Sequence, residues 1–517
     1  ANAAARDISR ENLMSDTFFP ALFERMVAAT VAMAMEALTR LEPAQFGYGV
    51  VETDALHNDR RCENPDVQDD RLHLFRFDRA DGSPMGLFMV HSVHGTILDA
   101  DERHISRDAI GGIEDKVKES FDSEVEVFML QAGAGDMSPG SPALEITGDL
   151  PAIDSHYNRI EALGNLAAET VQSGFWDIET SADVAIRSIS FHVPLGRDLM
   201  GYEDGEFPFE GGGAYCGSTV ESECWSGEPK PIEDLDKKCL DIKTLAAGMG
   251  YDETAPDRTS MNAALVGDVL LVTFPGEPVT QCLLNVEEEI RGEFPEQDDI
   301  VVLGYSQDYL GYSTPEWDFY QGAYEASGAI YGPKQGDYLT ARAADVARSL
   351  LDGSGDVPFT DPGRPPLVIP EDASWQVMFA LDAGKIVNEP PSAVTAGETV
   401  VFEFTGGSPW LLVPEVVLEQ EVNGTFQPVR RANGAIVDSA GYEYAIEVLP
   451  EPTYEANPDV KSRKFVWHFE LATDRRVPAA HFPLSGTYRL RATGQYLPSG
   501  SLDLVDYDLA SAPFAVE

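Results

Sequence analysis

The pattern of apolar residues changes character once along this chain, within residues 353–370. Before this stretch, short strand patterns alternate with apolar stripes at helical spacing, which cover 17–41, 106–121, 155–172 and 338–352. After it, only short strand patterns occur, separated by turn signals, at 400–404, 410–413, 465–471 and 486–492. Gly, Pro and Asp are dense in 353–370 itself, as in a linker. We therefore predict an α/β domain over 1–362, a mixed sheet with helices, then the linker and a C-terminal immunoglobulin-like β-sandwich over 363–517.

One apolar run shows where the first domain has its centre. Ala263–Phe274 is almost unbroken and predicts a central buried strand, which Pro275 and Gly276 end. The next residue is Glu277, and a carboxylate at the end of a central strand is where α/β active sites form. The alternative is a structural one, because a Glu at a helix N-terminus is favoured by the helix dipole.

The charge balance excludes several kinds of partner. Lys and Arg number 36 and Asp and Glu number 88, so the net charge is −52. Nucleic acid and anionic membranes need clustered cations on the protein, so neither is an expected partner. A strongly solvated surface explains the excess acid. Dedicated cation sites are the alternative, and the long acidic loop over 200–257 is a weak candidate for a structural Ca²⁺ or Mg²⁺ site.

The sequence contains no apolar stretch long enough to span a membrane, and no signal peptide stands at its start. Three of the five cysteines, Cys216, Cys224 and Cys239, lie within 24 positions of a Gly-rich acidic region. This clustering indicates local disulfides in an oxidising compartment. We therefore expect the protein to be secreted, either extracellular or periplasmic.

Three further segments contain residues that can carry chemistry. His91 and His94 lie in a strand-like context, where a separation of three puts them on opposite faces, so we expect only one of them to face a site. Ser138 lies in a Gly-rich turn after a strand, which forms either a tight turn or an exposed nucleophile. A third segment, 304–333, holds six tyrosines, which indicates either a polar aromatic-walled site or an aromatic core: Tyr305, Tyr309, Tyr312, Tyr320, Tyr324 and Tyr331.

These segments, in this order, resemble the neutral/alkaline (non-lysosomal) ceramidase family. The family's W-F-x-x-H-x-T-S-M is matched loosely by Phe88–Thr96, and its G-D-[VM]-S-P-N by Gly135–Gly140. Its P-G-E after an apolar strand is Pro275–Glu277. Its N-D-Y-x-x-Y and R-Y-E-A-A-S-T-x-Y-G-P are similar to 307–312 and 323–333. The end of the chain, Ser485–Arg491, resembles the family's C-terminal immunoglobulin-like domain, so the likeness covers nearly the whole chain.

The resemblance implies a function and a set of roles. Family members are zinc hydrolases that cleave the N-acyl amide of ceramide to sphingosine and a fatty acid. It implies one Zn²⁺ per chain, with 1–362 as the catalytic domain and ceramide or another N-acyl lipid as substrate. By the same resemblance, His94, Glu277 and Tyr312 are zinc ligands, Ser138 is the catalytic serine and Tyr324 stabilises the oxyanion. The family's N-R-S-P is altered here to Asn58-Asp59-Arg60-Arg61, so either Arg60 or Arg61 corresponds to its catalytic arginine, and we take Arg60.

The chain departs from the family at its beginning. The family's H-T-H-S-G-P-G-G, which contributes another zinc histidine and an acid–base histidine, has no counterpart before the helix expected at 17–41. The N-terminal part of the family fold is therefore expected to be missing here. We favour a processed or incomplete chain; the alternatives are that a separate N-terminal polypeptide completes the zinc site or that the protein has lost the site. The competing hypothesis is a non-catalytic lipid-binding or surface protein that keeps the fold.

Overall fold

The structure is a computed structural model, and its placed residues lie in these segments: 20–61, 67–98, 105–140, 152–203, 256–320, 323–329, 331–364, 379–395, 398–409, 411–430, 434, 436–439, 445–449, 462–473, 485–501 and 503–517. The predicted cysteine cluster and nearly all of the acidic loop at 200–257 lie outside these described residues. Of the cysteines, Cys282 is described, as a buried free thiol.

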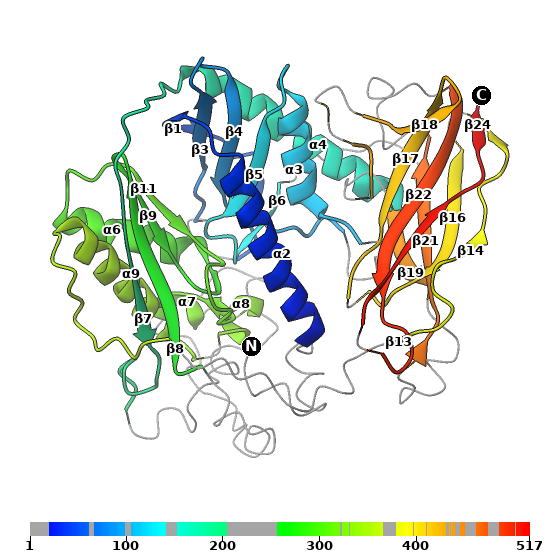
Figure 1. Cartoon of the computed structure of the whole chain (residues 1–517). Coiled ribbons are helices and arrows are strands. Elements are labelled where there is room, and N and C mark those ends of the chain that lie inside the picture. Colours follow the sequence, from blue (N-terminus) through cyan, green and yellow to red (C-terminus); the bar gives the residue numbers. More distant parts are fainter. Residues whose placement is uncertain are drawn as a thin grey trace.

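Two four-stranded mixed sheets form the first part of the molecule (Figure 1). In the first sheet, β4 and β5 are parallel and the other neighbours antiparallel; its order is β1 (Ala44–Glu52), β3 (Arg71–Arg79), β4 (Pro84–His91) and β5 (Glu126–Gln131). In the second sheet, β9 and β11 are parallel; its order is β11 (Ile300–Leu303), β9 (Val269–Thr273), β8 (Arg258–Val266) and β7 (Ile186–Pro194). The predicted mixed sheet is therefore two sheets.

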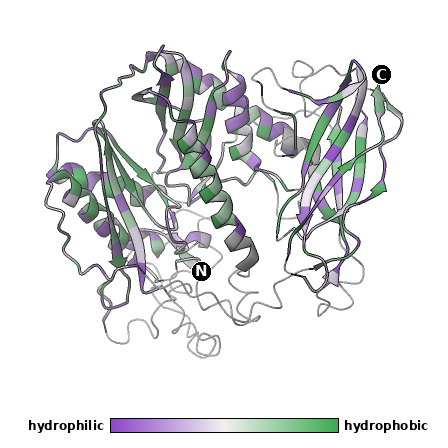
Figure 2. Ribbon diagram, in the orientation of Figure 1, coloured by the Kyte–Doolittle hydropathy of each residue, from purple (hydrophilic) through white to green (hydrophobic). Residues whose placement is uncertain are grey.

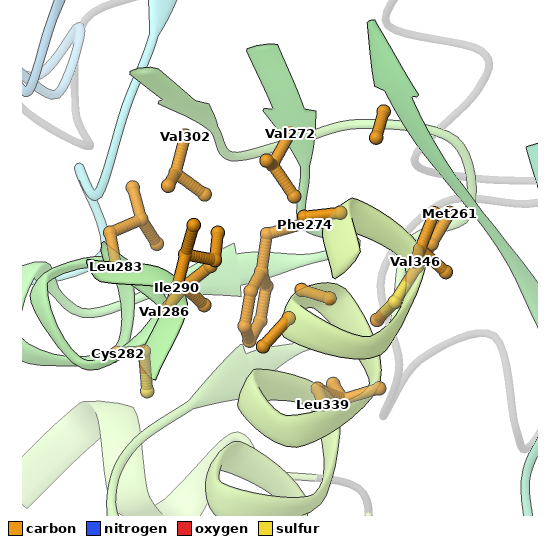
Figure 3. Packing of buried hydrophobic residues seen from close by; sticks show 14 of the residues in the cluster. Met261, Val272, Phe274, Cys282, Leu283, Val286, Ile290, Val302, Leu339 and Val346 are labelled. Atoms are coloured by element: carbon orange, nitrogen blue, oxygen red, sulfur yellow. The ribbon is translucent and has the colours of Figure 1, made fainter. Parts of the chain in front are cut away.

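Side-chain alternation along β3 explains how the sheets are layered. Leu72 and Leu74 pack into a core with α3 (Asp108–Glu119) and α4 (Ala152–Gly174). Phe75, on the opposite face of the same strand, packs into a second core with the other sheet. That second core also contains α6 (Thr280–Glu293) and α9 (Gln335–Leu351), and Figure 3 shows Phe274 among the side chains of these elements. The sheets thus face each other, with helices on both outer sides.

The apolar run at 263–274 is not the single strand that we predicted. It forms the end of β8 and the whole of β9, joined by a tight turn at Gly267 and Asp268. Gly267 has a φ of 62°, which glycine adopts without strain and which lets the chain reverse. The apolar pattern could not reveal the reversal, because both strands are buried.

The described residues of the C-terminal part form two larger β-sheets (Figure 1) and a short parallel pair, β13 (Phe379–Ala380) with β20 (Ser462–Arg463). One has the order β14 (Lys385–Asn388), β16 (Thr399–Gly406), β21 (Phe465–Ala472) and β19 (Ala445–Leu449). The other has the order β15 (Ala393–Val394), β24 (Phe514–Val516), β22 (Gly486–Tyr496), β17 (Glu415–Val422) and β18 (Thr425–Pro428), with β23 (Val505–Ala510) paired to β22. One apolar core contains side chains of both sheets. Of the strand predicted at 410–413, the described residues 411–413 lie outside any strand. The immunoglobulin-like class stays a prediction.

The helix α2 (Pro20–Thr39) is mostly apolar along its coloured part in Figure 2. Its large apolar side chains are uncovered, among them Met33 at 64% and Met35 at 60% exposure. Helices that are apolar on all sides are normally buried. Within the described part of the chain, no helix is long and apolar enough to cross a bilayer.

Candidate active site

The candidate site lies where four strands end. His94 follows β4, Ser138 follows β5, Glu277 follows β9 and Tyr312 follows β11. Strands β4 and β5 are parallel neighbours, and so are β9 and β11. Parallel strands end at the same edge of a sheet, and the two sheets face each other, so four segments far apart in sequence meet at one edge. Two short bridges, β10 (Glu277–Pro278) with β12 (Tyr312–Ser313) and β2 (His57–Asp59) with β6 (Met137–Pro139), join these segments.

The three side chains expected to be zinc ligands converge. His94 Nε2 lies 3.4 Å from Glu277 Oε2 and 3.5 Å from the Tyr312 hydroxyl oxygen. Residues Glu277 and Tyr312 are register partners in the parallel β10–β12 pair, which places their side chains on the same side. Both are buried, with 9% and 6% exposure, and His94 is half-buried.

Hydrogen-bond donors surround the Glu277 carboxylate. The Tyr309 hydroxyl donates to Oε1 at 2.7 Å and the Tyr305 hydroxyl to Oε2 at 3.0 Å. Burial alone raises the pKa of Glu277, but hydrogen bonds from His94 and from three tyrosines, Tyr309, Tyr312 and Tyr305, outweigh it and lower the pKa to about 2. Glu277 is therefore a carboxylate at any physiological pH, as a metal ligand requires.

The segment that contains Ser138 is fixed to the rest of the site through the backbone. The His94 amide donates to the Met137 carbonyl at 2.8 Å, and the Gly135 amide donates to the Pro278 carbonyl at 2.9 Å. A Cβ at Gly135 would lie 2.7 Å from the Pro278 carbonyl oxygen, so only glycine allows this approach. In the β2–β6 pair, Ser138 lies opposite Asn58.

Arg60 and Tyr324 complete the set of expected residues. The Arg60 guanidinium donates to the Gly135 carbonyl at 2.8 Å and lies over the Tyr324 ring, 6.0 Å from its centroid. The rings of Tyr324 and Tyr312 are in edge contact with their centroids 5.3 Å apart. Tyr324 is 65% exposed, so this residue is open to solvent beside the buried Tyr312. The structure thus brings together the residues that the motifs nominated.

The donor set fits zinc in type and in spacing. Zinc takes nitrogen and oxygen ligands at about 2.0–2.1 Å, which puts neighbouring donors of a tetrahedral site roughly 3.3 Å apart. The two separations measured from His94 Nε2 are close to this value. Among the described residues, no group of three His, Cys, Asp or Glu side chains could hold a metal ion. The candidate site has only two donors of these types, His94 and Glu277, and its third donor is a tyrosine.

His91 and His57 lie in the protein interior, and no described contact joins either of them to Glu277 or Tyr312. Their rings stack with centroids 4.5 Å apart, and each Nδ1 lies near a backbone carbonyl, that of Arg71 for His91 and that of Ser92 for His57. Burial lowers the pKa of both imidazoles. Of the two histidines near the end of β4, His94 is therefore the one that lies beside Glu277 and Tyr312, as the family resemblance implies, whereas strand alternation alone did not distinguish them.

The sequence leaves Arg61 open beside Arg60, but it does not nominate the two carboxylates that pair with it. Arg61, Asp318 and Glu325 are buried and joined by ion pairs, and Glu325 is paired with Arg60 as well. Arg61 and Asp318 are 257 positions apart. The signal that could have suggested them is that Arg61 and Glu325 are each adjacent in sequence to a residue nominated by the motifs.

Several known proteins are similar to this chain in sequence or in fold. No family model matches the chain. Neutral ceramidase B of Dictyostelium discoideum is 27% identical over 240 residues, which cover 41% of this chain and 32% of that protein. Neutral ceramidase A of the same organism is 30% identical over 194 residues, 34% and 27% of the two chains. The chain therefore spans about a third or less of these two relatives' length.

A match to the neutral ceramidase of Mycobacterium tuberculosis (strain ATCC 25618 / H37Rv) is longer, at 23% identity over 454 residues, and covers 77% of this chain and 69% of that one. The crystal structure of neutral ceramidase from Pseudomonas aeruginosa superposes with a TM-score of 0.66 at 16% identity, covering 96% of this chain and 80% of that chain. A structure described as ceramidase complexed with C2 gives a TM-score of 0.65, also at 16% identity, and covers 93% of this chain and 78% of that one.

The chain thus has the mixed α/β fold of a ceramidase. The matches in sequence and in structure support the neutral ceramidase family, which confirms the resemblance seen in the motifs.

Proposed function

We propose that this protein is a zinc-dependent amidohydrolase that cleaves the N-acyl amide bond of ceramide or a related N-acyl lipid, giving a free fatty acid and a sphingosine-type amine. The likeness to proteins named neutral ceramidase supports the substrate class. The observation that carries the proposal is the convergence of His94, Glu277 and Tyr312 within 3.5 Å at the ends of parallel strands.

Each side chain has a role that its position supports. His94, Glu277 and Tyr312 would bind the zinc, which when bound polarises a carbonyl and acidifies water. Ser138 acts as the catalytic serine, on a segment that hydrogen-bonds to the backbone of both His94 and the Glu277 strand. The exposed Tyr324 hydroxyl donates to the oxyanion that develops on the substrate carbonyl. Arg60 orients Tyr324 relative to the segment that contains Ser138, because it contacts both the Gly135 carbonyl and the Tyr324 ring.

A substrate panel tests the proposal. Ceramides and other N-acyl amines are incubated with the protein, and both products, fatty acid and amine, are quantified. We expect equal amounts of the two products from at least one member, with loss of turnover in Glu277→Gln. The control is Glu288→Gln, which changes an exposed glutamate on α6. If no N-acyl amide is hydrolysed by the zinc-loaded protein, either alone or together with an N-terminal polypeptide that completes the zinc site, the proposal is wrong.

We further propose that a separate N-terminal polypeptide completes the zinc site and covers α2. Two observations support it: a single imidazole stands among the three converging side chains, and α2 is an apolar helix with an uncovered surface. A charge introduced with Met35→Glu would then weaken docking of that polypeptide on α2 and so lower the zinc bound per chain. No described contact joins Met35 to the site itself, so the loss of zinc would come from the lost polypeptide. Unchanged zinc content in this variant would contradict the proposal.

The single imidazole also favours a second candidate, a lipid-binding or surface protein that keeps the fold without catalysis. This candidate predicts that ceramide binds without turnover and that Glu277→Gln leaves binding unchanged. Turnover of any ceramide excludes it.

We propose a secreted location, extracellular or periplasmic, on the basis of the cysteines in 216–239. Mass measurement of the alkylated protein, with and without reduction, tests this. A disulfide supports an oxidising compartment, and alkylation of all five thiols without reduction contradicts it.

A further inference from the structure

Glu325 follows the exposed Tyr324 in the chain and has its side chain buried in the protein. Glu325 lies in the short helix α8 (Ala323–Ser327) and is 1% exposed, whereas Tyr324 is 65% exposed. Two arginines share its carboxylate. Arg60 Nε donates to Oε1 at 2.7 Å and Arg61 Nη1 donates to Oε2 at 2.8 Å. A single buried carboxylate therefore binds the side chains of two consecutive arginines, which are 265 and 264 positions away in sequence.

Arg61 also binds a second buried carboxylate, that of Asp318. Its Nε and Nη2 donate to Asp318 Oδ1 at 3.1 and 2.7 Å, and Nη2 donates to the Asp318 backbone carbonyl at 3.1 Å. The side chains of Arg61 and Asp318 are 2% and 1% exposed. Burying these charges is costly, and apolar residues of similar volume often stabilise a fold as well or better. A positional role is therefore a better explanation of the ion pairs than stability.

Arg60 is the member of this group that reaches the site. Its side chain is 26% exposed, and it contacts the Gly135 carbonyl, the Tyr324 ring and the Tyr312 hydroxyl. Among the described residues, Glu325 is the carboxylate that pairs with it. If the Glu325 charge were removed, the Arg60 guanidinium would lose the bond that fixes its orientation toward both tyrosines.

We propose that Glu325 is a positioning residue, which fixes Arg60 against Tyr312 and Tyr324 and thereby sets the geometry of the oxyanion donor. The inference rests on the proposed amidase function. It adds a residue that contacts neither the substrate nor the metal and acts through Arg60.

The C-terminal sheets offer a matched control. Glu419 is 4% exposed and also lies near two arginines: Arg489 Nε is 2.5 Å from its Oε2 and Arg491 Nη1 is 3.7 Å from its Oε1. Glu325→Gln and Glu419→Gln therefore remove the same charge from similar surroundings. Both variants are expected to lower the unfolding midpoint, and only Glu325→Gln is expected to lower kcat.

A double-mutant cycle with Arg60→Met separates positioning from stability. We expect Glu325→Gln and Arg60→Met each to lower kcat by roughly 10- to 100-fold with little change in KM, as for groups that orient a site. The double variant should be no slower than Arg60→Met alone, because Glu325 acts through Arg60. If the two effects multiply, or if Glu325→Gln keeps full kcat, the proposal is wrong.

A readout that does not depend on activity distinguishes this proposal from the proposed function. The protein carries 3-fluorotyrosine at position 324, and its fluorine NMR resonance is recorded. Glu325→Gln should shift this resonance and Glu419→Gln should not. A resonance that is unchanged in Glu325→Gln overturns the positioning role, even if the wild type hydrolyses ceramide. A shifted resonance in a protein that hydrolyses no amide supports positioning and contradicts the amidase.

Discussion

The α/β part and the C-terminal β part differ in what they bury. The C-terminal core is formed by large apolar side chains that alternate along paired strands, such as Phe402, Phe404, Trp467 and Phe469. The α/β part has comparable apolar cores, but between them, at the edge where its parallel strands end, it buries Glu277, Asp318 and Glu325. Buried carboxylates are costly unless they are paired or bind a metal. In the described C-terminal residues one carboxylate, Glu419, is buried, paired with Arg489. The comparison teaches that the site differs in gathering several buried carboxylates at one edge of the fold.

The largest expected effect breaks the core of the β part. Trp467→Ala removes a fully buried ring and the hydrogen bond from its Nε1 to the Gly407 carbonyl at 3.0 Å. We expect a loss of about 3–5 kcal/mol in the free energy of unfolding, measured in urea by circular dichroism. The kcat of the folded fraction should change less than about twofold, since the ring does not contact the site. A large fall in that kcat would show that the two parts are coupled.

Next in size is a change at the site itself. Tyr312→Phe removes one donor of the proposed zinc site and leaves the ring packing intact. We expect kcat/KM to fall by more than about 100-fold, because losses at groups that only support a metal ligand already reach 10- to 100-fold. Tyr309→Phe is the matched variant: Tyr309 donates to Glu277 Oε1 without contacting His94 in any described bond, and its effect should be about 10-fold. Equal effects from the two variants would contradict a ligand role for Tyr312.

A smaller effect is expected from a methyl group beside Tyr312. A Cβ at Gly328 would lie 2.7 Å from Tyr312 Cδ2, so Gly328→Ala must displace that ring. We expect about 1–3 kcal/mol of destabilisation, as in an overpacked core, together with a fall in kcat. Gly292, in α6, has no atom within 4 Å of such a Cβ, so Gly292→Ala should leave kcat unchanged. Full activity in Gly328→Ala would show that the ring position is not critical.

The smallest expected effect concerns pH. In the β part, hydrogen bonds from His468 to Glu470 and Glu403 raise the pKa of His468 to about 9, although burial opposes them. Because the folded pKa exceeds the unfolded one, this contribution is complete below about pH 6.5 and is lost as pH rises through about 9. Solvent screening limits it to about 1 kcal/mol. The difference in urea midpoint between wild type and His468→Gln should shrink from pH 6 to pH 10, and a constant difference would contradict the assignment.

The sequence predicts the elements of both parts better than it predicts the site. Periodicity placed α9 and β21 within a few residues, because each packs one regular face. It failed at 263–274, where two buried strands follow one another, and at 411–413, where apolar residues lie outside any strand.

For the site, the family motifs nominated Glu277 and Tyr312, which the structure pairs in register. Periodicity could not nominate Tyr312, because an isolated tyrosine looks the same in a core and in a site. The contacts among Arg61, Asp318 and Glu325 could not be predicted, since they depend on how the two sheets face each other rather than on local sequence.

The central claim is that the ends of four strands form a zinc site. The most direct test is elemental analysis of zinc in the protein purified without chelator, together with the N-terminal polypeptide that we propose as completing the site. We predict about one zinc per chain in the wild type and in Glu288→Gln, and almost none in Glu277→Gln. Absence of zinc from all three, or equal zinc in all three, would contradict the account.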